Sequence, residues 1–121
     1  MIILSKTVML VDDSRFMRNL LKSKIESSGY IVVAEAGNGE DAVKLYEKHS
    51  PHIVLLDITL PNMNGIAVLK KIKKINPDTH VIMCSAMGTQ DFVIEALENG
   101  ADDFIVKPFF DDLIIKLNKI N

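Results

Sequence analysis

The chain has 121 residues, of which 48% are hydrophobic and 25% are charged. This length suits one domain, predicted over residues 1–121, and the apolar share excludes a disordered polymer. The formal net charge of -2 gives no overall positive field for nucleic acid, and the apolar runs are far shorter than the roughly 20 residues that span a bilayer. We therefore expect a cytoplasmic protein that binds neither nucleic acid nor membranes.

Five short apolar runs predict five strands. In chain order they lie at residues 8–11, 31–34, 53–56, 81–84 and 104–106. None of them alternates with polar residues. Continuous hydrophobicity is typical of parallel strands that helices cover on both faces.

The segments between and after these runs show the 3.6-residue apolar spacing of helices. Asp13 or Ser14 can cap the first helix and Asn38 the second. The third helix is expected to open at Asn64, the fourth to start at Thr89 and the last at Asp111. The side chains expected on the apolar faces are Phe16, Met17, Leu20, Leu21 and Ile25; Ala42, Val43 and Tyr46; Ile66, Leu69, Ile72 and Ile75; Phe92, Val93, Ala96 and Leu97; and Leu113, Ile114, Leu117 and Ile120. The lysines of the third helix are expected to point mostly outward, as a solvated flank: Lys70, Lys71, Lys73 and Lys74.

This fivefold alternation of strand and helix predicts an α/β fold of the (βα)5 type, a doubly wound five-stranded parallel sheet with helices on both faces. Strand–helix–strand crossovers are almost always right-handed, so the carboxyl ends of all five strands should lie at one edge of the sheet. In the flavodoxin-like strand order 2-1-3-4-5, ligands bind beyond that edge, where the strand order reverses. A binding site is therefore expected there.

Polar residues follow four of the five predicted strands. Asp12 and Asp13 follow the first strand, Asp57 the third, Ser85 the fourth and Lys107 the fifth. Each has an ordinary explanation alone, such as a helix cap, a turn residue or a solvated side chain. Together these explanations require four coincidences at one sheet edge, which favours a functional site.

The residue types indicate what such a site does. Three carboxylates in a partly desolvated cleft repel one another, and a hard divalent cation with a preference for oxygen ligands, such as Mg²⁺, offsets that repulsion. A carboxylate beside Mg²⁺, an ammonium group and a hydroxyl group is placed to attack phosphorus. The lone carboxylate in the middle of the cleft, Asp57, is the predicted nucleophile.

The same residues belong to motifs that extend over nearly the whole chain. The motifs are Val11-Asp12-Asp13-Ser14, Leu55-Leu56-Asp57, Pro61 with Asn64-Gly65, Cys84-Ser85-Ala86 and Phe104-Ile105-Val106-Lys107-Pro108-Phe109. With these motifs, in this order and at these distances, the sequence resembles the receiver domain of two-component response regulators. It is most similar to the stand-alone chemotaxis members of that family.

The resemblance implies roles for the site residues. Asp57 would accept a phosphoryl group from a histidine kinase, Ser85 would hydrogen-bond that group and Lys107 would pair with it. Mg²⁺, with Mn²⁺ as a substitute, would be held by Asp12, Asp13, the Asp57 side chain and the backbone carbonyl of Thr59. The protein would then catalyse only its own phosphorylation and dephosphorylation and would not be an enzyme for other substrates.

The resemblance also implies a conformational switch. Lys107-Pro108 would be a cis peptide, and Ser85 would be coupled to the ring of Phe104, so that phosphorylation reshapes the face of the fourth helix, fifth strand and fifth helix. The expected partners are a histidine kinase, a flagellar motor switch protein or other output protein, and a dedicated phosphatase, with the chain itself a monomer.

Three positions depart from the best-known chemotaxis pattern. Phe104 stands where that pattern has a tyrosine, so no phenolic hydroxyl is available. Thr59 and Met87 offer no carboxylate or amide to position a water that attacks the acyl phosphate. The lifetime of the phosphorylated state is therefore open.

Other functions remain as alternatives. The chain fits a phosphorelay intermediate or a receiver domain cut from a longer response regulator. An FMN-binding flavodoxin-like carrier is disfavoured because the first strand–helix loop has Asp12 and Asp13 in place of a Gly/Ser/Thr-rich phosphate cradle. A Mg²⁺-dependent phosphatase typically has an acid two residues after its nucleophile, where this chain has Thr59.

The remaining reactive side chains have ordinary interpretations. Cys84 is the only cysteine and is expected to be a small buried apolar residue. His49, His52 and His80 lack the spacing of metal ligands and are expected at the surface.

Overall fold

The structure of the protein is a computed structural model that describes residues 6–86, 90–108 and 110–120. The strands are β1 (Thr7–Val11), β2 (Ile31–Ala36), β3 (Ile53–Asp57), β4 (His80–Ser85) and β5 (Asp103–Val106). The helices are α1 (Arg15–Glu26), α2 (Gly39–His49), α3 (Gly65–Ile75), α4 (Gln90–Glu98) and α5 (Leu113–Lys119). The predicted fivefold alternation of strand and helix is confirmed.

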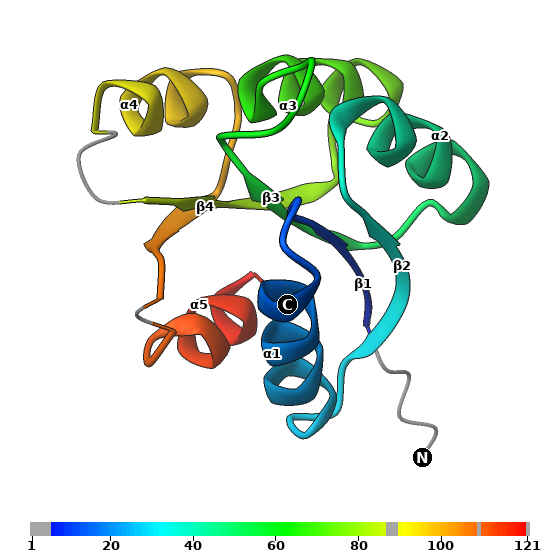
Figure 1. Cartoon of the computed structure of the whole chain (residues 1–121), viewed down its shortest axis with the longest axis vertical. Coiled ribbons are helices and arrows are strands. Elements are labelled where there is room, and N and C mark those ends of the chain that lie inside the picture. Colours follow the sequence, from blue (N-terminus) through cyan, green and yellow to red (C-terminus); the bar gives the residue numbers. More distant parts are fainter. Residues whose placement is uncertain (1–5, 87–89, 109, 121) are drawn as a thin grey trace.

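The five strands form one parallel sheet in the order β2-β1-β3-β4-β5, as predicted. Figure 1 shows the sheet nearly edge-on, with α2, α3 and α4 over one face and α1 and α5 over the other. The loops after β1 and β3 therefore lead to helices on opposite faces, although the two strands are neighbours. This divergence opens the carboxyl edge of the sheet at the point where the strand order reverses.

Alternate residues of the central strands enter two separate cores. On the side of α2, α3 and α4 the core contains Met9, Val54, Leu56, Val81 and Met83. On the side of α1 and α5 it contains Val8, Leu10, Leu55, Ile82 and Cys84. Because successive side chains of a strand point to opposite faces, a central strand that helices cover on both faces requires apolar residues at successive positions. The continuous apolar runs of the sequence have this cause.

The apolar faces of the helices are narrower than the sequence predicts. Leu21 and Ile25 of α1, Val93 and Ala96 of α4, and Ile72 of α3 are buried as expected. Five other side chains expected on the apolar faces are more than two-fifths exposed: Phe16, Leu20, Ile75, Phe92 and Leu97. A helix that packs on a flat sheet buries only the arc facing it, so apolar residues at the margin of the predicted stripe stay in contact with solvent.

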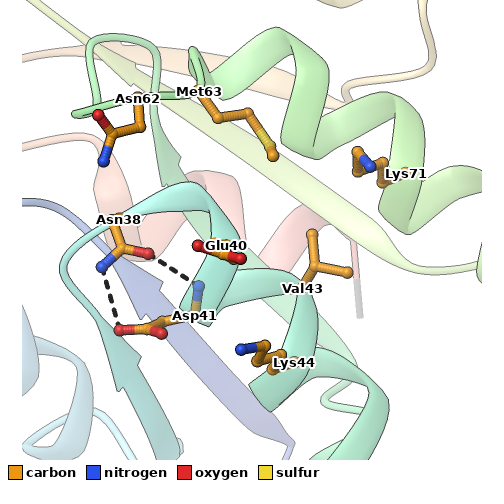
Figure 2. Close-up of a pocket in the computed structure, with 8 residues that line it drawn as sticks. All are labelled: Asn38, Glu40, Asp41, Val43, Lys44, Asn62, Met63 and Lys71. Carbon is orange, nitrogen blue, oxygen red and sulfur yellow. Dashed lines mark hydrogen bonds between the residues drawn. The ribbon is translucent and has the colours of Figure 1, made fainter.

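Three of the predicted helix caps are confirmed. The Ser14 hydroxyl accepts a hydrogen bond from the Met17 amide at 3.2 Å, and the Asn64 side chain accepts one from the Ala67 amide at 2.9 Å. The Asn38 side chain caps α2 by accepting from the Asp41 amide at 2.8 Å, as Figure 2 shows.

The beginnings of the last two helices fall elsewhere. Helix α5 begins at Leu113 with Asp112 at the cap position, two residues beyond the predicted helix start at Asp111, and the Asp112 side chain makes no capping hydrogen bond. Thr89, the predicted start of the fourth helix, lies outside the described residues.

The lone cysteine and the histidines have the expected locations. Cys84 is 2% exposed, His49 and His52 are exposed, and His80 is partly exposed. No helix among the described residues is long and apolar enough to cross a membrane.

Candidate functional site

Three carboxylates meet at the carboxyl edge of the sheet. Asp12 directly follows β1, Asp13 begins the turn into α1, and Asp57 is the last residue of β3. One carboxylate oxygen from each lies within 4.8 Å of the other two. Asp12 and Asp57 are buried, whereas Asp13 is exposed and forms the solvent side of the cluster.

Lys107 directly follows β5 and joins this cluster from the same edge of the sheet. Its Nζ donates to Asp57 Oδ2 at 2.8 Å and to Asp12 Oδ2 at 3.0 Å, although these residues are 50 and 95 positions away in the chain. The Lys107 side chain is 17% exposed, so solvent screens these ion pairs only in part. Three carboxylates and one ammonium leave two formal negative charges in the cluster.

The protonation of the cluster follows from this burial and charge. Burial raises the pKa of Asp57 above its ordinary value, against the opposing effect of the Lys107 ammonium. Burial alone would lower the pKa of Lys107, but its hydrogen bonds and charge attraction to Asp57 and Asp12 outweigh it and raise that pKa. Lys107 therefore stays charged, while the Asp57 anion needs more positive charge than Lys107 supplies.

Backbone contacts hold the first carboxylate in place. The Asp12 amide donates to the carbonyl of Ala36 in β2 at 3.0 Å. The Asp12 carboxylate accepts from the Ser14 amide through Oδ1 at 2.9 Å and from Lys107 through Oδ2. Both oxygens of Asp12 thus have donors, and Asp13 keeps its oxygens open toward solvent.

The segment after β3 fixes Asp57. Its Oδ1 accepts from the Thr59 amide at 3.1 Å, and the Gly65 amide donates to the Ile58 carbonyl at 2.6 Å. A Cβ at position 65 would lie 2.0 Å from the backbone oxygen of Asp57. Only glycine permits this close approach, which presses the start of α3 against the end of β3 and explains the glycine in the Asn64-Gly65 motif.

The donor set fits a hard divalent cation. It consists of oxygen atoms only, carries excess negative charge and has two buried carboxylates beside one that is open to solvent. Mg²⁺ binds one or two carboxylates and keeps several waters, which this arrangement allows. The carbonyl of Thr59, the fourth predicted ligand, remains a prediction.

Ser85 lies at the same sheet edge, where its side chain is 2% exposed. It follows Cys84, which pairs with Asp57 across β3 and β4, and its own partner in β5 is Val106. Among the described residues, no hydrogen bond joins the Ser85 hydroxyl to the four charged side chains. The structure therefore brings Asp12, Asp13, Asp57 and Lys107 together and places Ser85 at the edge beside them.

The predicted switch residues have distinct surroundings. The Lys107-Pro108 peptide is cis, as predicted. Phe104 is partly buried against the core on the α2–α4 side. The Lys116 Nζ of α5 lies 5.1 Å from the centre of the Phe104 ring and donates to the Phe104 carbonyl at 2.6 Å. Met87 and Phe109 lie outside the described residues.

Two contacts near the site were not predicted. Arg18 donates to the carbonyl of Asp12, and Lys116 covers the ring of Phe104. Neither residue belongs to an apolar stripe or follows a strand, so no pattern in the sequence marks it. The i,i+6 spacing of Asp12 and Arg18 becomes informative only once the turn into α1 is known.

A separate pocket of about 470 Å³ lies between α2 and the segment before and along α3 (Figure 2). Its lining includes Asn38, Asp41, Lys44, Asn62, Met63 and Lys71. Both acidic and basic side chains line it, and Asn38 and Asp41 bond to each other at 3.0 Å. None of the clustered carboxylates lines this pocket, so the acidic site is a different feature of the molecule.

The family model of the response regulator receiver domain matches residues 8–119. The chain therefore belongs to this family and is a receiver domain of a two-component system. A chemotaxis protein CheY from Thermotoga maritima is 50% identical over 119 residues, which cover 98% of this chain and 99% of that protein. CheY from Bacillus subtilis is 50% identical over 113 residues, covering 93% of this chain and 94% of that protein.

Solved structures agree with this family. The CheX–CheY–BeF3–Mg²⁺ complex from Borrelia burgdorferi contains a chain with a TM-score of 0.90 and 36% identity, covering 95% of this chain and 88% of that one. The predicted resemblance and the flavodoxin-like receiver fold are thereby confirmed. Membership of this family decides against the FMN-carrier alternative.

Proposed function

We propose that Asp57 accepts a phosphoryl group from a histidine kinase and that the phosphorylated domain controls a partner protein in chemotaxis. The convergence of Asp57 with Asp12, Asp13 and Lys107 carries this proposal. An aspartate at the end of a strand has ordinary explanations when it stands alone, such as a helix cap. Three clustered carboxylates with one ammonium group, which pairs with two of them, form a site with unbalanced charge. Such a site is suited to a divalent cation and a phosphoryl group together.

The transfer uses groups that the fold already holds in place. A carboxylate oxygen of Asp57 attacks the phosphorus of the donor phosphohistidine, a P–O bond forms, the P–N bond breaks, and the imidazole leaves with the electron pair. Asp12, Asp13 and Asp57 would hold Mg²⁺, together with the Thr59 carbonyl. When bound, Mg²⁺ supplies positive charge for the phosphoryl oxygens. Lys107, charged and paired with Asp57, is placed to contact those oxygens as the charge develops.

The relatives support two parts of the proposal: that the site binds Mg²⁺ and that the domain acts on a partner protein. The Borrelia burgdorferi CheY structure contains Mg²⁺, BeF3 and the protein CheX. By likeness to it, we infer that this chain binds Mg²⁺ and docks on a protein partner once phosphorylated. A histidine kinase is the inferred donor, and a flagellar motor switch protein the inferred output partner, because the relatives are chemotaxis proteins.

The output passes through Ser85 and Phe104 in this proposal. Movement of the Ser85 hydroxyl toward the phosphoryl group would leave room for the Phe104 ring to turn inward. The surface that this change reshapes belongs to α4, β5 and α5, where four large apolar side chains are exposed: Phe92, Ile94, Leu97 and Ile115. Exposed apolar groups of this kind suit a protein partner.

Acetyl phosphate with Mg²⁺, followed by intact-mass measurement, tests the chemistry. The wild-type protein should gain one phosphate, and Asp57→Asn should gain none. Asp102→Asn, the same change at the opposite edge of the sheet, is the matched control and should be phosphorylated like the wild type. Gain of one phosphate by Asp57→Asn as readily as by the wild type would defeat the assignment of the acceptor.

A pull-down with BeF3 and Mg²⁺ tests the partner. Enrichment of a motor switch protein supports the chemotaxis output. Enrichment of a histidine phosphotransfer protein without a motor protein would favour the phosphorelay alternative.

A turnover assay tests the further proposal that the domain acts only on its own phosphoryl group. Steady multiple turnover of a phosphate monoester would contradict it.

A further inference from the structure

Arg18 contacts the loop after β1 that carries Asp12 and Asp13, here called the acidic loop, and the transfer chemistry above does not use this contact. It lies in the first turn of α1, and its amide donates to the carbonyl of the cap residue Ser14 at 3.0 Å. Its side chain, 15% exposed, turns back toward the sheet. There the Arg18 Nη1 donates to the backbone carbonyl of Asp12 at 2.5 Å, and Nε donates to Glu35 Oε1 in β2 at 3.2 Å.

These bonds fix the peptide that leads from Asp12 to Asp13. The carbonyl of Asp12 belongs to that planar peptide, so holding the oxygen also holds the direction in which the chain reaches Asp13. The amide of Asp12 is held on its other side by Ala36. Among the described residues, no group donates a hydrogen bond to the Asp13 carboxylate, so its place in the cluster depends on the backbone beneath it.

The pair of Arg18 and Glu35 fixes the direction of the acidic loop more than it changes the electric field at the carboxylates. Glu35 balances the charge of Arg18, which limits the field of the pair at the carboxylates. Lys22 also lies near Glu35, with Nζ 3.8 Å from Oε2, but its side chain is 42% exposed. Within the part of the chain that the structure describes, Lys22 makes no hydrogen bond to the acidic loop. Lys22 therefore lies near Glu35, as Arg18 does, but does not contact the carbonyl of Asp12.

We propose that Arg18, anchored by Glu35, is a positioning residue that holds Asp12 and Asp13 in the geometry needed to bind the divalent cation. This inference rests on the proposed function, because it concerns the same cation site. Arg18 touches neither the cation nor the phosphoryl group and acts only through the Asp12–Asp13 peptide.

Urea unfolding of the full chain, followed by circular dichroism in EDTA and at increasing Mg²⁺, separates this role from a merely structural one. The stability in EDTA reports packing, whereas the increment that Mg²⁺ adds reports its affinity for the folded site. For Arg18→Met we expect the Mg²⁺ dissociation constant to rise about tenfold, equivalent to about 1.4 kcal/mol of binding free energy. For the matched control Lys22→Met we expect a change of less than about twofold, or about 0.4 kcal/mol.

The outcomes are distinguishable. A wild-type Mg²⁺ affinity in Arg18→Met, whatever its stability in EDTA, would overturn the positioning role and leave the proposed function intact. A wild-type protein without any Mg²⁺ increment would overturn the proposed function and this inference with it. If Arg18→Met does not fold, Glu35→Leu decides: removal of the anchor should weaken Mg²⁺ binding about threefold, or about 0.7 kcal/mol, and an unchanged affinity would overturn the inference.

Discussion

Polar residues lie at both the amino and the carboxyl edge of the sheet, but their charges are balanced differently. At the amino edge, Thr7 at the start of β1 pairs with His52, with its hydroxyl 3.0 Å from His52 Nδ1. Next to them, His80 Nδ1 lies 3.3 Å from Asp102, whose other oxygen accepts from the Val81 amide at 2.8 Å. Each of these polar side chains has a partner: Thr7 and His80 begin strands, and His52 and Asp102 directly precede neighbouring strands.

At the carboxyl edge the positive charge of the partner does not balance the negative charge of the carboxylates. Three carboxylates, of Asp12, Asp13 and Asp57, lie together, and the one ammonium group of Lys107 pairs with Asp12 and Asp57. The pKa of Asp57 is raised because the effect of burial outweighs that of the ammonium group. The amino edge resembles an ordinary polar boundary of a sheet, whereas the carboxyl edge keeps an electrostatic cost that a ligand can relieve. Unbalanced charge, more than polarity, distinguishes the functional edge.

The largest effect is expected from Lys107→Met. This change leaves Asp12 and Asp57 buried without their ammonium partner, so the free energy of unfolding in EDTA should fall by about 3 kcal/mol. Saturating Mg²⁺ should restore part of the loss, because the cation takes over the role of the positive charge. Urea unfolding with and without Mg²⁺ measures both quantities.

The control for that prediction is His80→Gln at the amino edge. Its contact with Asp102 is partly exposed, so the change should cost about 0.5 kcal/mol or less and should not respond to Mg²⁺. Equal losses in the two variants would remove the distinction between the edges.

Gly65→Ala should have the next largest effect. The new Cβ would lie 2.0 Å from the Asp57 backbone oxygen, so the start of α3 or the end of β3 must move, at a cost of about 2 kcal/mol. Phosphorylation by acetyl phosphate should slow as well, because Asp57 moves with its backbone. Gly37→Ala, whose Cβ would meet only Arg18 Nη1 at an ordinary 3.5 Å, should change stability by about 0.5 kcal/mol at most. Similar costs for both alanines would show that the close approach at Gly65 is relieved easily.

A smaller effect of the opposite sign is expected for Asp57→Asn. Because burial raises the pKa of Asp57, its ionised form destabilises the folded protein at neutral pH, and the asparagine variant should be more stable in EDTA by on the order of 1 kcal/mol. As pH falls through the raised pKa toward the ordinary value of 3.8, the wild-type carboxylate is protonated in the folded state and the difference should close. Mg²⁺ should favour the wild type instead.

Urea unfolding across pH measures this difference. Asp102→Asn is the counterpart at the amino edge and should give no stabilisation, since Asp102 pairs with His80 and accepts from the Val81 amide. A wild type more stable than Asp57→Asn in EDTA at neutral pH would contradict the account of the charge surplus.

The last prediction involves no change in stability and concerns the thiol of Cys84, which pairs with Asp57 across β3 and β4. Burial, reinforced by the charge of Asp57, raises the pKa of Cys84 to about 12. In the folded protein, the thiol should therefore stay protonated and react with a disulfide reagent at mildly alkaline pH far more slowly than in urea. A reaction as fast as that of the unfolded chain would show that β4 opens readily beside the site.

The sheet and most of the site could be predicted because both are encoded in short continuous segments: an apolar run and the polar residue that follows it. Strands covered on both faces are largely apolar, so the first polar residue after an apolar run marks the end of the strand, as at Asp12, Asp57 and Lys107. Parallel crossovers then bring those residues to one edge without any knowledge of side-chain packing. The family resemblance added the cis peptide before Pro108, which no periodicity indicates.

Features that depend on packing between distant segments could not be predicted. Phe16 and Phe92 fit an apolar helical stripe, yet both are exposed because the sheet covers only part of that stripe. The bond from Arg18 to Glu35 joins α1 to β2 across 17 positions, and only the folded arrangement brings them together. Side chains that act through such contacts show no regular spacing in the sequence by which they could be recognised.

The most direct test of the central claim is to locate the phosphoryl group within the chain. After reaction with acetyl phosphate and Mg²⁺, borohydride reduces an aspartyl phosphate to homoserine, and fragmentation mass spectrometry identifies the position. The account predicts homoserine at position 57 alone. Homoserine at position 12 or 13, or at an aspartate of the amino edge such as 102, would contradict it.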